Sequence, residues 1–275
     1  MGFQINTNTA ANTAYRNLSN TQNDVSKSLE KLSSGLRINR AADDAAGLAI
    51  SEGLRSQIGG LGVAARNAQD GISVVQTAEG SLTEVHSILQ RVRDLAVQSG
   101  NDSNNAEART AIQTEVTALG EELSRIATST NFNGTDLLSA GAADLTFQIG
   151  AGSTAANDQI TVAATDIEAV AAAVAALTFT SAADALTSIA AIDTQIQDVS
   201  EARSKLGAVQ NRFESAINSI NVSQENLSAA KSRISDTDMA KEMADFTRSN
   251  ILSQAGTAML AQANQMNQGV LQLLR

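Results

Sequence analysis

Few residues in this 275-residue sequence could carry catalytic chemistry. The single histidine, His86, could serve a Ser-His-Asp triad, but one imidazole cannot build a two-histidine zinc site, and no His-Glu-x-x-His motif occurs. His86 also lies in an apolar helical repeat between Leu82 and Leu89, which favours a histidine on a helix surface or seam. There is no cysteine, so thiolate catalysis, a disulfide and a cysteine-based zinc site are excluded.

Paired carboxylates and clustered glycines are two further features that could indicate a site. Asp43 and Asp44 could hold a metal or act as acid and base, but they directly precede an apolar stretch that begins at Ala45. Acidic residues placed there cap a helix and interact favourably with its dipole, so capping at a domain junction is the stronger interpretation. The three glycines within 59–62 lack the strand–turn–helix context of a phosphate loop. We therefore predict no enzyme, no metal site and no cofactor.

A seven-residue apolar repeat dominates the sequence, so long helices must position everything else. Every seventh residue from Ile192 to Ile234 is large and apolar, and every seventh residue from Leu54 to Ala96 is apolar. Such a repeat keeps one seam facing a partner helix and predicts left-handed coiling. The absence of proline suits uninterrupted helices, because an interior proline costs about 3 kcal/mol. We predict a mainly α fold, a long antiparallel helical bundle or coiled-coil rod with the N- and C-termini paired.

Two shorter segments complete the predicted bundle. Residues 105–128 carry apolar residues at alternating spacings of four and three, and a turn at 100–104 lets this helix fold back on the helix over 44–99. Residues 145–149 and 160–162 alternate with period two, which predicts a small β-hairpin, preceded by a turn at Asn133-Gly134. The Ala-rich stretch that follows carries little pattern, and we expect 166–180 to be a short outer tip.

The two ends of the chain share a polar, Asn/Gln/Ser-rich composition with narrow apolar stripes. Residues 1–36 and 237–275 could not bury enough surface alone to offset about 1–2 kcal/mol of ordering entropy per residue. We expect them to order by packing on each other and on neighbouring copies of the chain. The residues predicted to form this polymerisation core lie on the apolar stripes and are Leu18, Val25, Leu29, Leu32, Met243, Phe246, Leu252, Met259 and Met266.

Charge and hydropathy bear on partners and location. The net charge of −10 argues against nucleic-acid binding, which needs a basic patch to meet phosphate. Between Arg125 and Arg203 there are nine acidic and no basic residues, as expected of a solvated surface that keeps a polymer soluble. We find neither a signal-peptide pattern nor a stretch of 18 apolar residues, which taken alone predicts a cytoplasmic protein without membrane insertion.

Motifs near opposite ends of the chain resemble the signatures of bacterial flagellin. LEKLSSGLRIN at 29–39, followed by AADDAAGLAI at 41–50, is similar to the N-terminal signature of that family. LGAVQNR at 206–212, with SNIL at 249–252 and QANQ at 262–265, resembles the C-terminal signature. FNG at 132–134 and FQIGA at 147–151 match the segment that leads into the family's hairpin, so the resemblance covers about 1–165 and 181–275.

This resemblance implies a structural subunit that self-assembles into the helical flagellar filament and transmits motor torque for swimming. It implies a terminal coiled-coil inner domain from 1–40 and 236–275, and a helical rod with the hairpin from 41–165 and 181–235. The outer tip at 166–180 is then all that remains of the variable region of larger relatives. Flagellins are exported unfolded by the flagellar type III apparatus without a cleaved signal peptide, so the resemblance replaces the cytoplasmic prediction with an extracellular filament.

The resemblance also implies partners. These are further copies of the chain, the export apparatus with its chaperone, and the cap and hook-junction proteins. Recognition by the flagellin-sensing Toll-like receptor is implied at the positions that match Arg91, Leu95 and Glu115, although Asp94 replaces the Glu common in receptor-activating flagellins.

Three alternatives remain open. One is a hook–filament junction protein built on the same terminal coils, although the full C-terminal signature and the receptor-like stretch favour a filament subunit. Another is a coiled-coil effector or translocator, which should carry a long apolar membrane-inserting segment. The third is an enzyme displayed on a flagellin scaffold, which needs an insert far larger than 166–180.

Overall fold

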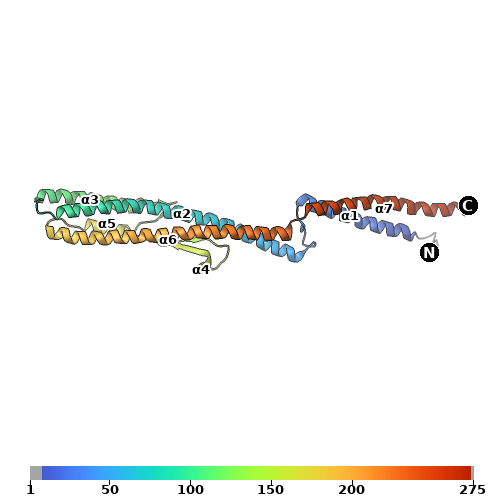
Figure 1. The fold of residues 1–275 in the computed structure, drawn as a ribbon, viewed down its shortest axis with the longest axis horizontal. Coiled ribbons are helices and arrows are strands. Elements are labelled where there is room, and N and C mark those ends of the chain that lie inside the picture. The colour runs from blue at the N-terminus through green and yellow to red at the C-terminus, as the bar shows by residue number, and fades with distance from the viewer. Residues whose placement is uncertain (1–7, 274–275) are drawn as a thin grey trace. The chain divides into compact units, whose positions relative to one another are not determined.

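The computed structural model describes residues 8–273, with side chains as far as residue 265, and long helices dominate it (Figure 1). In chain order the elements are α1 (Thr9–Ser34), α2 (Ala45–Ser99), α3 (Ala106–Ser129), β1 (Asn131–Phe132), β2 (Thr135–Asp136), β3 (Leu145–Gln148), α4 (Ala155–Asp158), β4 (Gln159–Val162), α5 (Glu168–Ala175), α6 (Ala182–Ser235) and α7 (Met239–Leu273). The prediction of a mainly α fold with a small hairpin is confirmed.

The chain divides into two compact units. Unit 1 comprises residues 1–56 with 226–275, and unit 2 comprises residues 57–225. The predicted boundaries near 40 and 236 lie where helices end, whereas these two units separate within α2 and α6. These two long helices therefore contribute to both units.

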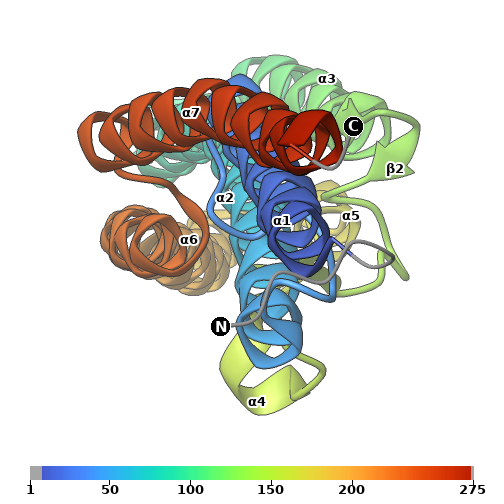
Figure 2. The same ribbon diagram turned by 90° about the vertical axis from the view of Figure 1, so that its right-hand side faces the viewer.

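Unit 1 is built on the antiparallel pairing of α1 with α7, which lie side by side in both views (Figures 1 and 2). The side-chain oxygen of Asn8 caps α1 by accepting a hydrogen bond from the N–H of Ala11 at 2.9 Å. α1 ends at Gly35, whose φ of 72° lies in the left-handed region that only glycine adopts without steric cost. Its N–H donates to the carbonyl of Lys31, so the last turn of the helix is closed.

In unit 2, α2 and α6 run antiparallel and bury the two predicted heptad repeats. Gly71 lies against Phe213, Arg203 donates to Glu79, and Arg93 donates to Asp193, so residue numbers rise along one helix as they fall along the other. The buried heptad positions are Ala68, Val75, Leu82, Leu89 and Ala96 on α2, and Ile192, Val199, Leu206, Phe213 and Ile220 on α6. The repeats are half-buried where they continue toward unit 1.

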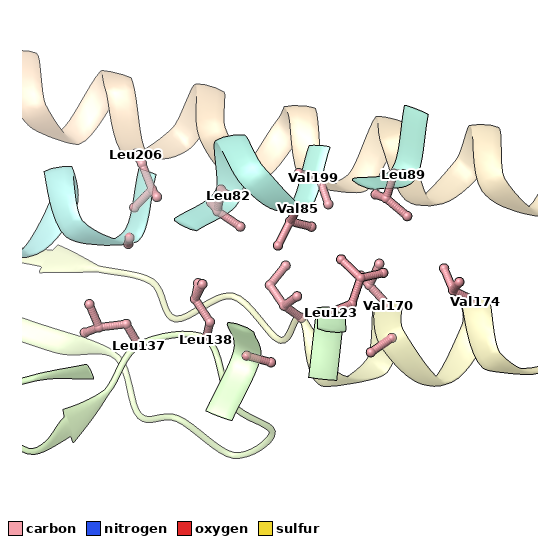
Figure 3. Close-up of a cluster of buried hydrophobic side chains, with 14 of the residues drawn as sticks. Leu82, Val85, Leu89, Leu123, Leu137, Leu138, Val170, Val174, Val199 and Leu206 are labelled. Atoms are coloured by element: carbon pink, nitrogen blue, oxygen red, sulfur yellow. The ribbon is translucent and has the colours of Figure 1, made fainter. Parts of the chain in front are cut away.

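α3 and α5 pack against this seam and complete the core of unit 2. Figure 3 shows the core side chains meeting between the elements, and those labelled are Leu82, Val85 and Leu89 from α2, Leu123 from α3, Leu137 and Leu138 from the following loop, Val170 and Val174 from α5, and Val199 and Leu206 from α6. Gly120 on α3 faces α5, and a β-carbon there would make ordinary van der Waals contact, 3.7 Å from Val174 and 3.9 Å from the carbonyl of Ala171.

This packing does not fit the expected outer tip at 166–180. Ile167, Val174 and Phe179 are all buried, and α5 packs along α3 rather than projecting into solvent. Gln113 on α3 holds the following turn, since its side chain donates to the carbonyl of Leu177 and accepts from the N–H of Phe179. The segment belongs to the core of unit 2.

One antiparallel strand pair lies at the predicted hairpin, and a second, shorter pair flanks the predicted turn at Asn133-Gly134. β1 and β2 flank a tight turn at Asn133 and Gly134, both of which have positive φ, as a two-residue hairpin turn requires. β3 and β4 pair in the register that sets Leu145 opposite Val162. In Figure 2, α4 at the tip of this second hairpin and α3 lie on opposite sides of the unit. The hairpin is held on the bundle by Asn67, which donates to the carbonyl of Gln148 at 3.0 Å.

Candidate functional site

The pairing of α1 and α7, called here the terminal pair, is held by few interactions. The side chain of Asn8 donates to the carbonyl of Ala263 at 3.0 Å, and Ala263 is buried. Leu18 packs against Gly256, where a β-carbon would come within 3.2 Å of its δ-methyl group. Among the described residues of unit 1, Ile38 is the only other fully buried apolar side chain. The terminal pair therefore has a seam but no core.

The residues predicted for the polymerisation core divide into two groups. Half-buried in the seam are Leu18, Val25, Leu32 and Phe246. Leu29, Met243, Leu252 and Met259 are instead exposed, and Met259 leaves 64% of its surface open to solvent. Met266 lies outside the described side chains. The predicted set therefore contains residues of the half-buried seam and residues of the exposed face, and the sequence pattern does not distinguish between them.

Three further apolar residues on the same helices are exposed but do not belong to the predicted polymerisation core. Tyr15 on α1 and Met239 and Ile251 on α7 are as open as the predicted positions, and Tyr15 is 64% exposed. The helical spacing of apolar residues in the sequence does include Tyr15, which lies one turn from Ala11 and from Leu18. Ile251 directly precedes the predicted Leu252, so the apolar surface of α7 is wider than one stripe.

The connecting segment, defined as residues 35–44 and 235–238, links α1 to α2 and α6 to α7. Leu36 and Asp236 form a β-bridge, and the N–H of Arg37 donates to the carbonyl of Ser235 at 2.7 Å. The Arg37 guanidinium donates twice to the carbonyl of Ile234, at 2.6 and 3.2 Å. These bonds use carbonyls that the end of α6 leaves free, so the segment is anchored mainly through backbone groups.

The two carboxylates at 43 and 44 serve this connecting segment. Asp44 accepts from the N–H of Gly47 at 2.8 Å and so caps the start of α2, as the sequence predicted. Hydrogen bonds from the backbone N–H groups of Arg40 and Asn39 hold the pKa of Asp43 below its usual value. Hydroxyl groups of Ser232 and Ser235 lower the pKa of Asp236 in the same way. In its ionised form Asp43 therefore stabilises the local backbone, whereas Asp236 accepts from hydroxyl groups at the end of α6.

Acid is expected to loosen the connecting segment through Asp43. A depressed folded-state pKa contributes stability that is present above the unfolded value, about 3.9 for aspartate, and is lost as the pH falls through the folded value. Protection of the amides at 39–43 against hydrogen exchange should therefore fall below about pH 4 and depend less on pH in an Asp43→Asn variant. An identical pH dependence in both proteins would contradict this assignment.

The residues that match the receptor-recognition surface lie on α2 and α3 of unit 2. Arg91 donates through Nε and Nη2 to a single carboxylate oxygen of Glu115, at 2.9 and 2.7 Å, and both side chains are exposed. Leu95 is only 2% exposed and lies in the core beneath them. The structure thus brings Arg91 and Glu115 together on the surface and places Leu95 underneath.

The remaining candidates for chemistry occupy structural positions. His86 is half-buried on α2, with its Nε2 2.9 Å from the side-chain nitrogen of Gln90 one turn away. Within residues 8–273 no group of three or more histidines and acids is arranged to hold a metal ion. None of the described helices is both long and apolar enough to cross a membrane.

Comparison with known proteins identifies the class. The bacterial flagellin N-terminal helical region matches residues 5–143, and the bacterial flagellin C-terminal helical region matches residues 189–274. The chain is 54% identical to the flagellin of Halalkalibacterium halodurans over 271 residues, 98% of this chain and 99% of that protein. It is 50% identical to the flagellin of Bacillus subtilis, over 99% of this chain and all of that protein.

Long paired helices with exposed apolar side chains define a structural coiled-coil protein. With these matches, the chain belongs to the bacterial flagellin family. It is a structural subunit of the flagellar filament, an extracellular assembly that forms by self-association.

Solved structures agree with the fold. A crystal structure of Bacillus cereus flagellin is 33% identical, covers 60% of this chain and 94% of its own, and superposes with a TM-score of 0.51. A Vibrio parahaemolyticus protein described as flagellar hook-associated covers 70% of this chain and all of its own, with a TM-score of 0.58. Its identity of 14% supports a shared fold alone, so it does not favour a junction protein over a filament subunit.

Proposed function

We propose that the terminal pair is the part of the subunit that polymerises, by burying its exposed apolar side chains on the terminal pairs of neighbouring copies. The main observation behind this proposal is that the terminal pair has almost no hydrophobic core. In the described part of unit 1 only Ile38 and Ala263 are fully buried apolar residues. Leu252 and Met259 on α7, with Leu29 on α1, stay exposed in the single chain. These side chains gain most from contact with another copy.

The energetic argument favours folding that is coupled to assembly. Fully burying one leucine or methionine side chain contributes about 1.5–3 kcal/mol, so a few such residues supply a substantial driving force. Ordering each residue costs about 1–2 kcal/mol, which the narrow seam of an isolated terminal pair cannot offset over two long helices. Each subunit therefore orders its ends as it joins the subunits already in place.

The same weakness suits export. A chain end without a core resists unfolding little, and this supports passage of the unfolded chain through the flagellar export apparatus without a cleaved signal peptide. An export chaperone would cover the exposed apolar face of α7 before assembly. Cap and hook-junction proteins, which meet the two ends of a filament, would contact the same terminal helices.

Seeded growth tests the proposed assembly. Purified protein, added to short filament seeds and viewed by negative-stain electron microscopy, should extend the seeds into long filaments of flagellar width. Short stubs or persistent monomers would favour a junction protein, which begins or ends a filament without propagating it.

A second function is recognition by the host flagellin-sensing Toll-like receptor. Arg91 and Glu115 support it, because their ion pair is exposed and presents a guanidinium of fixed orientation. The buried Leu95 would shape α2 beneath this surface rather than enter the interface directly.

Replacing Arg91 by alanine should weaken the receptor response by about thirtyfold or more, because the loss of one charged contact at an interface costs about 2 kcal/mol or more. Reporter cells that carry the receptor measure the response to purified monomer. Arg125→Ala is a matched control, since Arg125 forms a similar exposed pair with Glu122 on α3. Cells silent to the unmodified protein, or equally responsive to Arg91→Ala, would contradict the proposal.

A further inference from the structure

A trough runs along unit 2 between β4 and α6. Its larger part has a volume of about 550 Å³ and is walled by residues 161–166 on one side and by 198–212 on the other. A second hollow of about 390 Å³ continues it past Arg212 toward the hairpin tip. β4 pairs with β3 along one edge only, so its other edge is free of a strand partner among the described residues.

The floor of the trough is apolar, and its rim is charged. The buried Leu206 and the half-buried Val209 form the floor. The rim consists of the exposed charged residues of the lining, which are Asp166, Asp198, Glu201, Lys205 and Arg212. Glu201 is paired with Lys205 at 2.8 Å, and Asp166 accepts a hydrogen bond from the N–H of Ala169 in the first turn of α5. Asp198 is exposed and has neither an ion pair nor a side-chain hydrogen bond in the described structure. The trough therefore offers an unneutralised carboxylate beside an apolar floor.

One exposed face of α2 in unit 2 presents a basic residue beside an apolar one. Gly59, Val63, Arg66 and Asp70 follow one another on α2 at spacings of four, three and four, so they lie on one side of the helix. All four are exposed, Val63 to 47%, and nothing stands within 4 Å of the place where a β-carbon of Gly59 would lie. This face, called here the α2 ridge, combines an apolar side chain with a guanidinium and, one turn further on, the carboxylate of Asp70.

Arg66 is distinguished by its lack of a partner. Of the eight basic residues in unit 2, six form ion pairs with acids of the same unit. The two that form none within the described structure are Arg66 and Arg212, and Arg212 already lines the trough. Unit 2 holds 20 acids against these eight bases, so an unpaired arginine on its surface is unusual.

From this complementarity we infer that the trough of one subunit receives the α2 ridge of a second copy, with Val63 on the floor and Arg66 opposite Asp198. A helical polymer grows through contacts between two different surfaces of the same chain, and a trough that meets a ridge is such a contact. The stretch between Arg125 and Arg203 is excluded as the occupant, because it has nine acids and no basic residue to set opposite Asp198. The inference deepens the proposed assembly and rests on it.

Charge reversal at the two positions tests the contact. Arg66→Glu and Asp198→Arg should each shorten the filaments grown from seeds and slow elongation about tenfold or more, because each sets like charges against one another. The double variant R66E/D198R restores opposite charges with exchanged signs and should elongate within about threefold of the unmodified protein. The defects of the single variants should diminish in about 1 M salt, where charges are screened beyond about 3 Å.

Glu121→Arg is the matched control for Asp198→Arg, because Glu121 is exposed on α3, forms no ion pair in the described structure and undergoes the same change in charge. Circular dichroism of the monomers checks that all variants fold. Single variants that elongate normally, a double variant as slow as the singles, or a control as defective as Asp198→Arg would each overturn the inference. If the unmodified protein fails to extend seeds, the proposed assembly itself fails; if it grows and the variants behave alike, only this contact is refuted.

Discussion

A chain that ends at residue 236 is expected to remain a folded, soluble monomer that does not polymerise. Removing 237–275 deletes α7 and with it the partner of α1 and the exposed side chains of Leu252 and Met259. The core of unit 2 lies within 57–225 and loses none of its residues. Assembly should therefore fail while most of the thermal transition persists.

Electron microscopy of seeded growth measures whether the truncated chain assembles, and circular dichroism measures whether the thermal transition persists. Because a deletion removes many contacts at once, the point variants Leu252→Ser and Met259→Ser provide a finer test. Both side chains are mostly exposed in the single chain, so their loss should leave monomer stability within about 0.5 kcal/mol while reducing polymerisation. Gln262→Ser, at an exposed polar position of α7, is the control. Normal filaments from the truncated chain would show that the terminal pair is dispensable for assembly.

The heptad repeats allowed the core of unit 2 to be predicted from sequence. A period of seven keeps the same face of a helix inward over many turns, so Leu82 and Leu206 could be assigned to one seam without knowledge of the fold. In the terminal pair the same pattern was less informative. Leu29 and Val25 lie on neighbouring apolar registers, and sequence alone does not say which register faces α7 and which faces another copy.

The segment at 166–180 was misassigned because its composition lacks contrast. α5 reads Glu-Ala-Val-Ala-Ala-Ala-Val-Ala, so small apolar residues surround the helix and no polar face marks its solvent side. Its burial depends on a partner far away in sequence. α3 supplies that partner, and its Gln113 fixes the turn after α5. The local sequence pattern of α5 does not indicate this contact with α3.

Exposure of the receptor-matching residues was also beyond sequence reasoning. A motif match shows which residue types are present but not whether they are exposed. Leu95 is buried, whereas Arg91, one turn earlier on α2, is exposed. The pairing of Arg91 with Glu115 requires α3 to fold back on α2 in one register, which the turn at 100–104 permits but does not specify.

The two units differ in charge in a way that relates stability to assembly. Unit 2 has 20 acidic and eight basic residues, whereas the remaining residues, which form unit 1, have nine and 11. Copies of unit 2 therefore repel one another at low salt, and the apolar surface of the terminal pair must outweigh that repulsion. An unpaired Arg66 opposite Asp198 would offset part of it at the closest approach.

Phe213→Ala is expected to destabilise unit 2 by about 3–5 kcal/mol, the usual cost of removing a fully buried aromatic ring. The Phe213 ring is wholly buried on α6 and packs edge-to-face against Phe147 of β3, with centroids 5.6 Å apart and planes at 89°. It thereby joins the hairpin to the bundle. Thermal unfolding of the monomer measures the loss, which should be roughly 6–20 °C in a unit of this size. Val222→Ala, at an exposed apolar position on the same helix, is the control and should change little.

A substitution at Gly71, which lies against the Phe213 ring, tests whether the effect of Phe213→Ala comes from the loss of this ring or from a general defect in α6. A β-carbon at Gly71 would come within 2.6 Å of the Phe213 ring, so Gly71→Ala alone should destabilise by about 1–3 kcal/mol through overpacking. Without the ring that clash disappears, and alanine is favoured over glycine in a helix interior by about 1 kcal/mol. The same Gly71→Ala substitution should therefore destabilise the unmodified protein and stabilise the Phe213→Ala variant. A cost of equal sign in both backgrounds would mean that α2 and α6 do not approach each other here as closely as the structure places them.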